Sequence, residues 1–203
     1  MNIKKYFGNP SMPFRVDHRD HNMLHMMSER LIESLPNQPR EYVAVCIGTD
    51  RSTGDALGPL TGTFLNEMKP KHITVYGTLH DPVHAINLHE YIDMIEKKHR
   101  RPFIIAVDAC LGKRSSIGQL ILDKGPLKPG AAFNKDLKPI GDLQIIGVVN
   151  ISGFMEHTIL QNTRLSLVTD MAKQLARVLD HLDQQLTYQY SLPLAALKRE
   201  KSM

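Results

Sequence analysis

The chain has 203 residues, of which 42% are hydrophobic and 23% charged, so it can form one domain with a buried core but not two large ones. Its formal net charge of +4 does not demand a nucleic-acid partner, and its two cysteines exclude a disulfide framework and favour a reducing compartment. No apolar run reaches the roughly 18 residues of a membrane-spanning helix, and the N-terminus lacks the apolar core of a secretory signal. We therefore expect a cytoplasmic protein that uses neither a membrane nor specific nucleic-acid binding.

Apolar, strand-like segments alternate with amphipathic, helix-like segments along most of the chain. Residues 1–20 are predicted to be an irregular N-terminal lead-in, residues 21–190 a single α/β domain, and residues 191–203 a C-terminal tail. The predicted helices cover residues 21–35, 60–69, 83–98 and 164–186. The predicted strands cover residues 42–47, 73–76, 103–107, 119–122 and 143–149. This alternation predicts three layers, with a mostly parallel central sheet between helices on both faces.

Two aspartates lie where predicted strands end. Asp55 belongs to the turn in CIGTDRSTGDALGP, and Asp108 ends the apolar run in IIAVDACLG. Because the carboxyl ends of parallel strands share one edge of the sheet, we expect the two side chains to face a common cleft. Two carboxyl groups that approach closely cannot both ionise easily, so one pKa rises and the pair can act as acid and base.

Each aspartate also has a purely structural interpretation. Asp55 can complement the dipole of a helix that starts at the TGD turn, and Asp108 can cap the loop after its strand. Phosphate binding at the glycine-containing turn has no specific support, because the chain contains neither GxGxxG nor GxxxxGK[ST]. The pairing of the two aspartates on neighbouring strands is what favours chemistry over structure.

The same segments carry a resemblance to a known family. TGDALGPL resembles the strand-to-helix motif of the bacterial spore germination proteases, and IIAVDACLGKRSSIGQLILDKGPLKPG resembles their second aspartate strand. LQIIGVVN resembles the later strand that leads into their cleft. In length and overall pattern, the chain is most similar to the shorter YyaC-type sporulation proteins, which are related to the germination proteases. The same phosphorylase/hydrolase-like fold occurs in hydrogenase-maturation peptidases.

The resemblance implies an atypical aspartic-type endopeptidase that cleaves small acid-soluble spore proteins in the forespore or spore core. Only Asp55 and Asp108 match the two functional aspartates of the germination proteases. The chain departs from them in having Gly54 where a proline commonly precedes the first aspartate, in being much shorter, and in showing no evident counterpart of the removable pro-segment. No cofactor is expected for this mechanism.

Other polar residues are candidates for the rim of the site. Asp50, His80, Lys113, Arg114 and His157 follow predicted strands on the same sheet edge and are predicted to bind substrate. In hydrogenase-maturation peptidases acidic residues and a histidine hold a metal, so the resemblance leaves a metal-dependent alternative in which His157 joins Asp55 and Asp108 as ligands of a divalent ion. A third alternative is a binding protein that retained the fold and lost the chemistry, and association with further copies of the chain also stays open.

Overall fold

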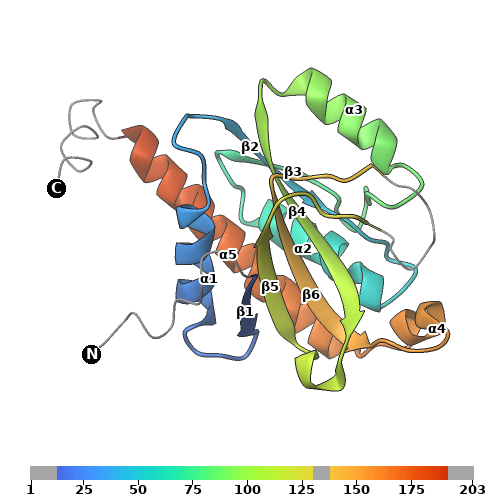
Figure 1. The fold of residues 1–203 in the computed structure, drawn as a ribbon. Helices are drawn as coiled ribbons and strands as arrows, with labels where there is room; N and C mark the ends of the chain where they lie inside the picture. The colour runs from blue at the N-terminus through green and yellow to red at the C-terminus, as the bar shows by residue number, and fades with distance from the viewer. Residues whose placement is uncertain (1–12, 130–137, 192–203) are drawn as a thin grey trace.

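The computed structural model describes residues 13–129 and 138–191 of the chain (Figure 1). Its centre is a six-stranded sheet in the order β1-β5-β6-β4-β2-β3. Strands β3, β2, β4 and β6 are parallel, whereas β5 pairs antiparallel with β6 and β1 antiparallel with β5. The strands are β1 (Phe14–Asp17), β2 (Glu41–Cys46), β3 (Ile73–Tyr76), β4 (Pro102–Gly112), β5 (Gln119–Lys124) and β6 (Leu143–Ile151). The predicted mostly parallel α/β sheet is confirmed.

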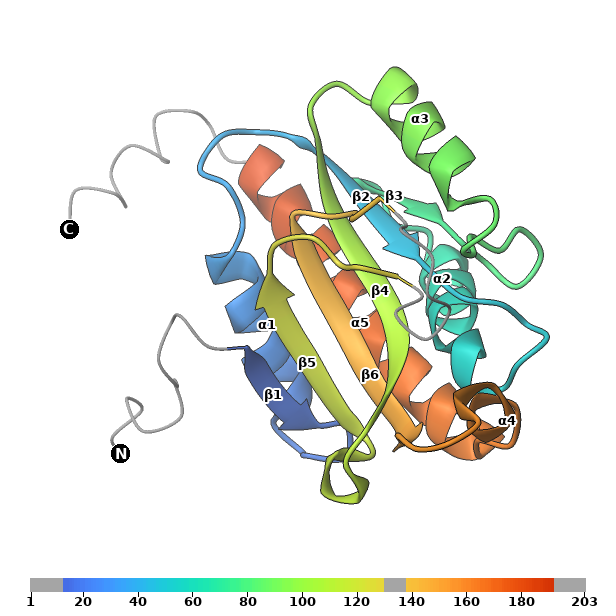
Figure 2. The ribbon, with the colours of Figure 1, turned by 45° about the vertical axis from the view of Figure 1, so that its right-hand side comes forward.

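Helices cover both faces of the sheet and bury two separate cores. The larger core lies between the sheet and α1, α2 and α5, which run behind the strands in Figure 2. The smaller core lies on the opposite face, where α3 packs on β2 and β4. The helices are α1 (Met23–Glu33), α2 (Leu57–Glu67), α3 (Leu88–Lys98), α4 (Glu156–Gln161) and α5 (Leu165–Ser191). Strands buried on both faces explain the continuous apolar runs of β2 and β4.

Helix α2 approaches the sheet so closely that two of its positions leave no room for a side chain. A Cβ added at Gly58 would lie 2.0 Å from the carbonyl oxygen of Ile47, and one at Gly62 would lie 2.0 Å from that of Gly77. Because α2 follows the turn that carries Asp55, this close approach fixes the turn against the carboxyl end of β2.

The structure corrects several predicted boundaries. Part of the expected lead-in forms β1, because Phe14–Asp17 pairs with β5 at the edge of the sheet. The helix predicted from residue 83 begins at Leu88, because Val83 forms a bridge with Ile47 instead. β4 does not end at residue 107 but continues to Gly112, since β6 pairs with it that far. Residues 1–12 and 192–203 lie outside the described part of the chain. Within that part, none of the helices is long and apolar enough to cross a membrane.

Candidate active site

The ends of β2 and β4 place Asp55 and Asp108 at one edge of the sheet. The pairing of β2 with β4 ends at Cys46 and Val107, after which the Ile47 N–H donates to the Val107 carbonyl at 2.7 Å. Asp108 is therefore the first residue of β4 beyond its partner. Asp55 lies in the short 3-10 helix η2 (Gly54–Ala56), which packs against β4. The parallel pairing of β2 and β4 therefore brings the ends of these two strands together, as predicted.

The turn that carries Asp55 is tied together by backbone hydrogen bonds. The Thr49 N–H donates to the Asp55 carbonyl at 3.1 Å, and the Ala56 N–H donates to the Ser52 carbonyl at 3.0 Å. Gly48 has a φ of 148°, and a Cβ at this position would lie 1.9 Å from the Asp55 carbonyl oxygen. Only glycine fits there, so the sharp turn at the end of β2 holds Asp55 close to the sheet.

The carboxyl group of Asp108 has a pKa near neutral pH. Burial raises its pKa from 3.8 to about 7; the hydrogen bond from the Ala109 N–H, at 2.8 Å, opposes this rise, and the negative charge of Asp55 adds to it. The residue as a whole is half-buried. A carboxyl group with such a pKa can serve as an acid or as a base at pH 7.

Asp55 is also partly buried, and burial raises its pKa above 3.8. The nearby Ser52 hydroxyl and the charge of His157 oppose this rise, because both favour the carboxylate. Ser52 Oγ is itself buried and forms no hydrogen bond of good geometry with any described residue, so we treat its effect on Asp55 as that of a nearby dipole. Ser52 was not predicted as a site residue, although a serine three positions before an aspartate at a helix start is a recognisable signal.

Helix α4 carries His157, and a side chain of β6 forms hydrogen bonds to this part of the chain. Nδ2 of Asn150, near the end of β6, donates to the Ile159 carbonyl at 3.3 Å and to Thr163 Oγ1 at 3.2 Å. Because η2 also packs against α4, this attachment fixes the wall beside Asp55. Neither α4 nor the role of Asn150 was predicted, since the short segment has weak helical periodicity.

The remaining predicted rim residues are exposed. Asp50, His80, Lys113 and Arg114 lie in loops after β2, β3 and β4, and their side chains form no ion pair or hydrogen bond with another residue in 13–129 or 138–191. His157 is exposed on α4, where its Nε2 lies within hydrogen-bonding distance, 3.0 Å, of the Gln161 side-chain amide. Of the five, His157 alone has an identified effect on an aspartate.

The described residues do not assemble the predicted metal site. Among them, no group of three or more histidine, cysteine, aspartate or glutamate side chains is placed to hold an ion. Asp55, Asp108 and His157 therefore do not form a ligand set in this conformation.

Cys110 lies two residues after Asp108 but is a poor nucleophile. Burial raises the pKa of its thiol to about 11, with a further contribution from the charge of Asp108 that outweighs an opposing one from Arg15. Burial alone raises the pKa of Cys46 to about 12. Neither thiol forms a thiolate readily at neutral pH.

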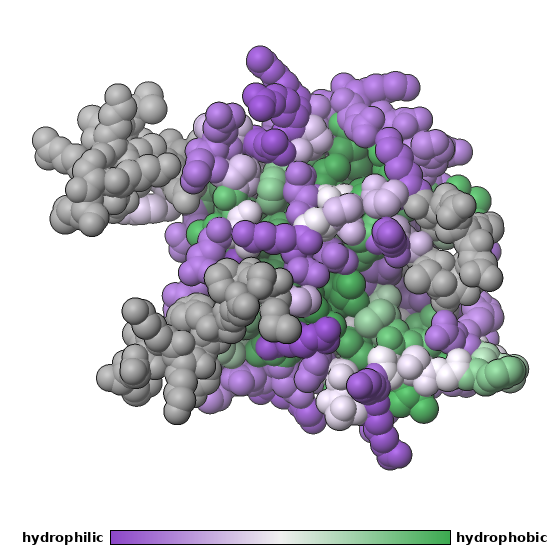
Figure 3. Space-filling model, viewed as in Figure 1, coloured by the Kyte–Doolittle hydropathy of each residue, from purple (hydrophilic) through white to green (hydrophobic). Residues whose placement is uncertain are grey.

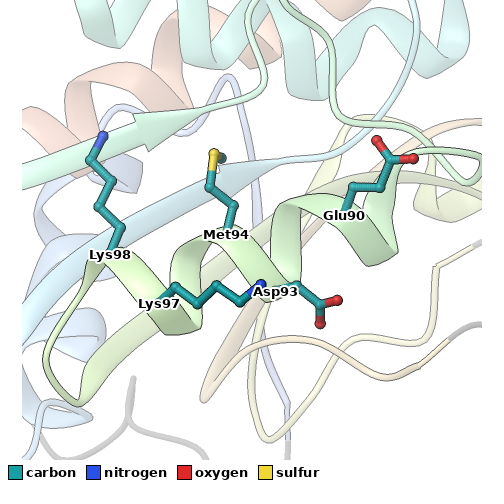
Figure 4. A pocket seen from close by; sticks show the side chains of 5 residues that line it. All are labelled: Glu90, Asp93, Met94, Lys97 and Lys98. Atoms are coloured by element: carbon teal, nitrogen blue, oxygen red, sulfur yellow. The ribbon is translucent and has the colours of Figure 1, made fainter.

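A shallow hollow on the outer side of α3 is a different kind of feature (Figure 4). Its walls are exposed side chains of both charges on one amphipathic helix, namely Glu90, Asp93, Met94, Lys97 and Lys98. None of the residues predicted for the site contributes to it. We therefore assign the candidate site to the aspartates and not to this hollow.

Comparison with known proteins identifies the family. Residues 15–178 match the family described as "Protein of unknown function (DUF1256)". The chain belongs to this family. It is also 57% identical over 144 residues to the "Uncharacterized protein YyaC" of Bacillus subtilis (strain 168), an alignment that covers 71% of this chain and 70% of that relative. The resemblance to YyaC-type proteins is confirmed.

A solved structure supports the fold assignment. The crystal structure of a [NiFe] hydrogenase maturation protease, HycI from Thermococcus kodakarensis KOD1, superposes with a TM-score of 0.53 and 19% identity. The match covers 76% of this chain and 99% of that protein. At this identity the likeness shows the α/β fold that was predicted, and activity has to be argued from the site.

Proposed function

We propose that the chain is a peptidase-like hydrolase in which Asp55 and Asp108 together activate water for the cleavage of an amide bond. The observation that carries this proposal is the pair itself: two carboxyl groups at the ends of neighbouring parallel strands, one of them with a pKa of about 7. A pair whose pKa values differ supplies both the acid and the base that amide hydrolysis needs.

The environments of the two groups suggest their roles. The Ser52 hydroxyl and His157 favour the charged form of Asp55, so Asp55 is the base that takes a proton from water. Asp108 holds its proton to higher pH and donates it to the nitrogen of the leaving amine. The hydroxide attacks the carbonyl carbon, the C–N bond breaks, and the two carboxyl groups return to their starting states by passing the proton from Asp55 to Asp108 through water.

The substrate and the biological setting that we propose are those of the germination proteases that the chain resembles. We propose that the chain acts during sporulation, in the forespore or spore core, and that it cleaves small acid-soluble spore proteins. A maturation protease shares the fold, which makes metal dependence the variant to test.

The experiment is the cleavage of a purified small acid-soluble spore protein, followed by mass spectrometry. We expect the wild type to cleave it with or without a chelator, and Asp55→Asn and Asp108→Asn each to reduce the rate by about a hundredfold or more. Asp123→Asn is the matched control, because the half-buried Asp123 accepts the same kind of hydrogen bond, from the Lys124 N–H, on β5.

Three results would count against parts of the proposal. Undiminished cleavage by either site variant would remove the aspartate pair from the mechanism. Cleavage lost with chelator and restored by a divalent ion would assign the reaction to a metal. A folded protein that binds the spore protein without turnover would be a binding protein.

A further inference from the structure

β4 extends beyond β2 and leaves part of its backbone without a partner strand. β2 pairs with β4 only as far as Val107, whereas β4 continues through Asp108 to Gly112 with β6 alone (Figure 2). The Val107 carbonyl points toward β2, because it accepts the Ile47 N–H. Backbone groups alternate in direction along a strand, so Ala109 points to the same side as Val107, where β2 has already ended. The pairing of β4 with β6 shifts register between Cys110 and Leu111, but the Gly112 carbonyl accepts the Ser152 N–H next to β6, so Leu111 again points to the side away from β6.

This open edge, the backbone of Ala109–Gly112 on the side away from β6, offers unused hydrogen-bonding groups. The Ala109 N–H is satisfied by the Asp108 carboxylate. β2 pairs with neither Ala109 nor Leu111, and within residues 13–129 and 138–191 no loop or side chain forms a hydrogen bond with the Ala109 carbonyl or the Leu111 backbone. All four residues of the open edge retain partial exposure to solvent. Ala109 and Leu111 are alternate residues whose backbone groups face away from β6. An extended peptide can pair with such a row of groups and add to the sheet as another strand.

Apolar side chains lie at the far end of the open edge. Gly112 pairs with Ile151, and the Ser152 N–H donates to the Gly112 carbonyl at 2.8 Å. From there the chain passes the end of β4 to reach α4 (Figure 1). Three side chains of this passage, the apolar lip, are unusually exposed for their type: Ile151 at 42%, Phe154 at 99% and Met155 at 69%. Figure 3 shows apolar surface in the same region.

Two positively charged side chains indicate which charge the bound peptide carries. Lys113 and Arg114 directly follow the open edge, are exposed, and form no ion pair with any described residue. A peptide whose apolar side chain contacts the lip would bring its next residues to these cations, which favour a carboxylate there.

We propose that an extended peptide binds as an additional strand on the open edge, with an apolar residue on the lip and an acidic residue beside Lys113 and Arg114. This inference rests on the proposed function and names its substrate class. Asp108 directly precedes the open edge, and the apolar lip lies at the opposite end of the edge. The two are separated by about 13 Å, the length of about four residues of extended chain. The apolar residue therefore lies about four residues from the bond that is cut.

The test uses the full chain with Asp55→Asn, so that binding is measured without turnover. The probe is a fluorescein-labelled peptide of alternating valine and threonine, with one leucine followed by one glutamate. In one analogue the backbone nitrogen is methylated at the leucine and at every second residue from it. In the other analogue the residues between these are methylated. Binding is followed by fluorescence anisotropy, and amide hydrogen exchange of Leu111 is measured by NMR.

We expect one methylated analogue to bind about tenfold more weakly and the other to bind normally, because only one set of N–H groups can face β4. Bound peptide should slow the exchange of the Leu111 amide. Phe154→Ser should weaken binding about tenfold, whereas Ile86→Ser, which alters a side chain 82% exposed ahead of α3, should not.

Absence of binding, equal binding of both analogues, or unchanged Leu111 exchange in the bound state would overturn the proposal. A dimer that excludes the peptide would assign the edge to a second copy and would overturn it too. If the peptide docks as expected but wild-type protein leaves it intact, the hydrolase proposal fails and the docking proposal stands.

Discussion

The negative charge of Asp55 raises the pKa of Asp108, although the two residues belong to segments far apart in the sequence. Burial and this repulsion together hold Asp108 protonated to about pH 7. The interaction depends on the turn after β2 being folded against β4, so it exists only in the native protein. Both the stability of the protein and the titration of Asp108 should therefore report on it.

Asp108→Asn should change how stability depends on pH. The pKa of Asp108 is about 7 in the folded protein and near 3.8 in the unfolded chain, so the folded state binds the proton more tightly. This contribution is complete below about pH 4 and is lost as the pH rises to about 7, at a cost of at most about 4 kcal/mol. The variant lacks the titration and can still accept the Ala109 N–H. Urea unfolding at about pH 4 and pH 8 measures the free energy of unfolding of both proteins. The variant should be more stable relative to wild type at about pH 8 than at about pH 4.

Asp123→Asn is the control for that comparison, since it removes a carboxylate that accepts a similar hydrogen bond on β5. Parallel stability curves for wild type and Asp108→Asn across this pH range would contradict a raised pKa at Asp108.

Asp55→Asn should lower the pKa of Asp108. The substitution removes the neighbouring negative charge but leaves the burial that is the larger cause, so the pKa should settle between 3.8 and about 7. Carboxyl ¹³C NMR titration measures it directly. Asp170→Asn, at an exposed position of α5, should leave the titration unchanged. An unaltered Asp108 titration in Asp55→Asn would mean that the two carboxyl groups do not interact.

The sequence was sufficient to locate these two residues because their positions follow from local patterns. Apolar runs before Gly48 and Asp108 indicate buried strands, and alternation with helices indicates parallel pairing. Parallel pairing then brings the carboxyl ends together, whatever the details of packing. The burial of the two side chains and the groups around them came only with the structure.

Features set by tertiary pairing could not be predicted in this way. Phe14–Asp17 is only four residues long, and it is a strand because β5 offers it an edge. The extension of β4 to Gly112 depends on β6, which is remote in the sequence. His99 directly follows the helix predicted to end at residue 98, yet it is buried and contacts Tyr76 and Glu41. In each case the partner, and not the local sequence, determines the outcome.

Asp183→Ala should destabilise the fold by about 3 kcal/mol. The Asp183 carboxylate on α5 is 4% exposed and accepts the backbone N–H groups of Lys71, His72 and Ile73 at 2.9, 2.7 and 2.9 Å. Its removal leaves buried donors unsatisfied at the start of β3. Urea unfolding measures the loss, and Asp170→Ala on the same helix should stay within about 0.5 kcal/mol of wild type. A loss of similar size in both variants would show that the three hydrogen bonds are not the source of the effect at Asp183.

Asn150→Ala should loosen α4 more than it destabilises the whole protein. The side chain makes two hydrogen bonds, to Ile159 and Thr163, and both are near the long end of the usual range, so about 1 kcal/mol of global stability is at stake. Amide hydrogen exchange should instead rise selectively in Glu156–Gln161, and hydrolysis should fall because His157 moves with the helix. Asn162→Ala, which removes an exposed bond to Thr158 within the same region, should leave exchange in the rest of α4 unchanged. Uniform faster exchange throughout the sheet would show that Asn150 supports the fold and not the position of α4.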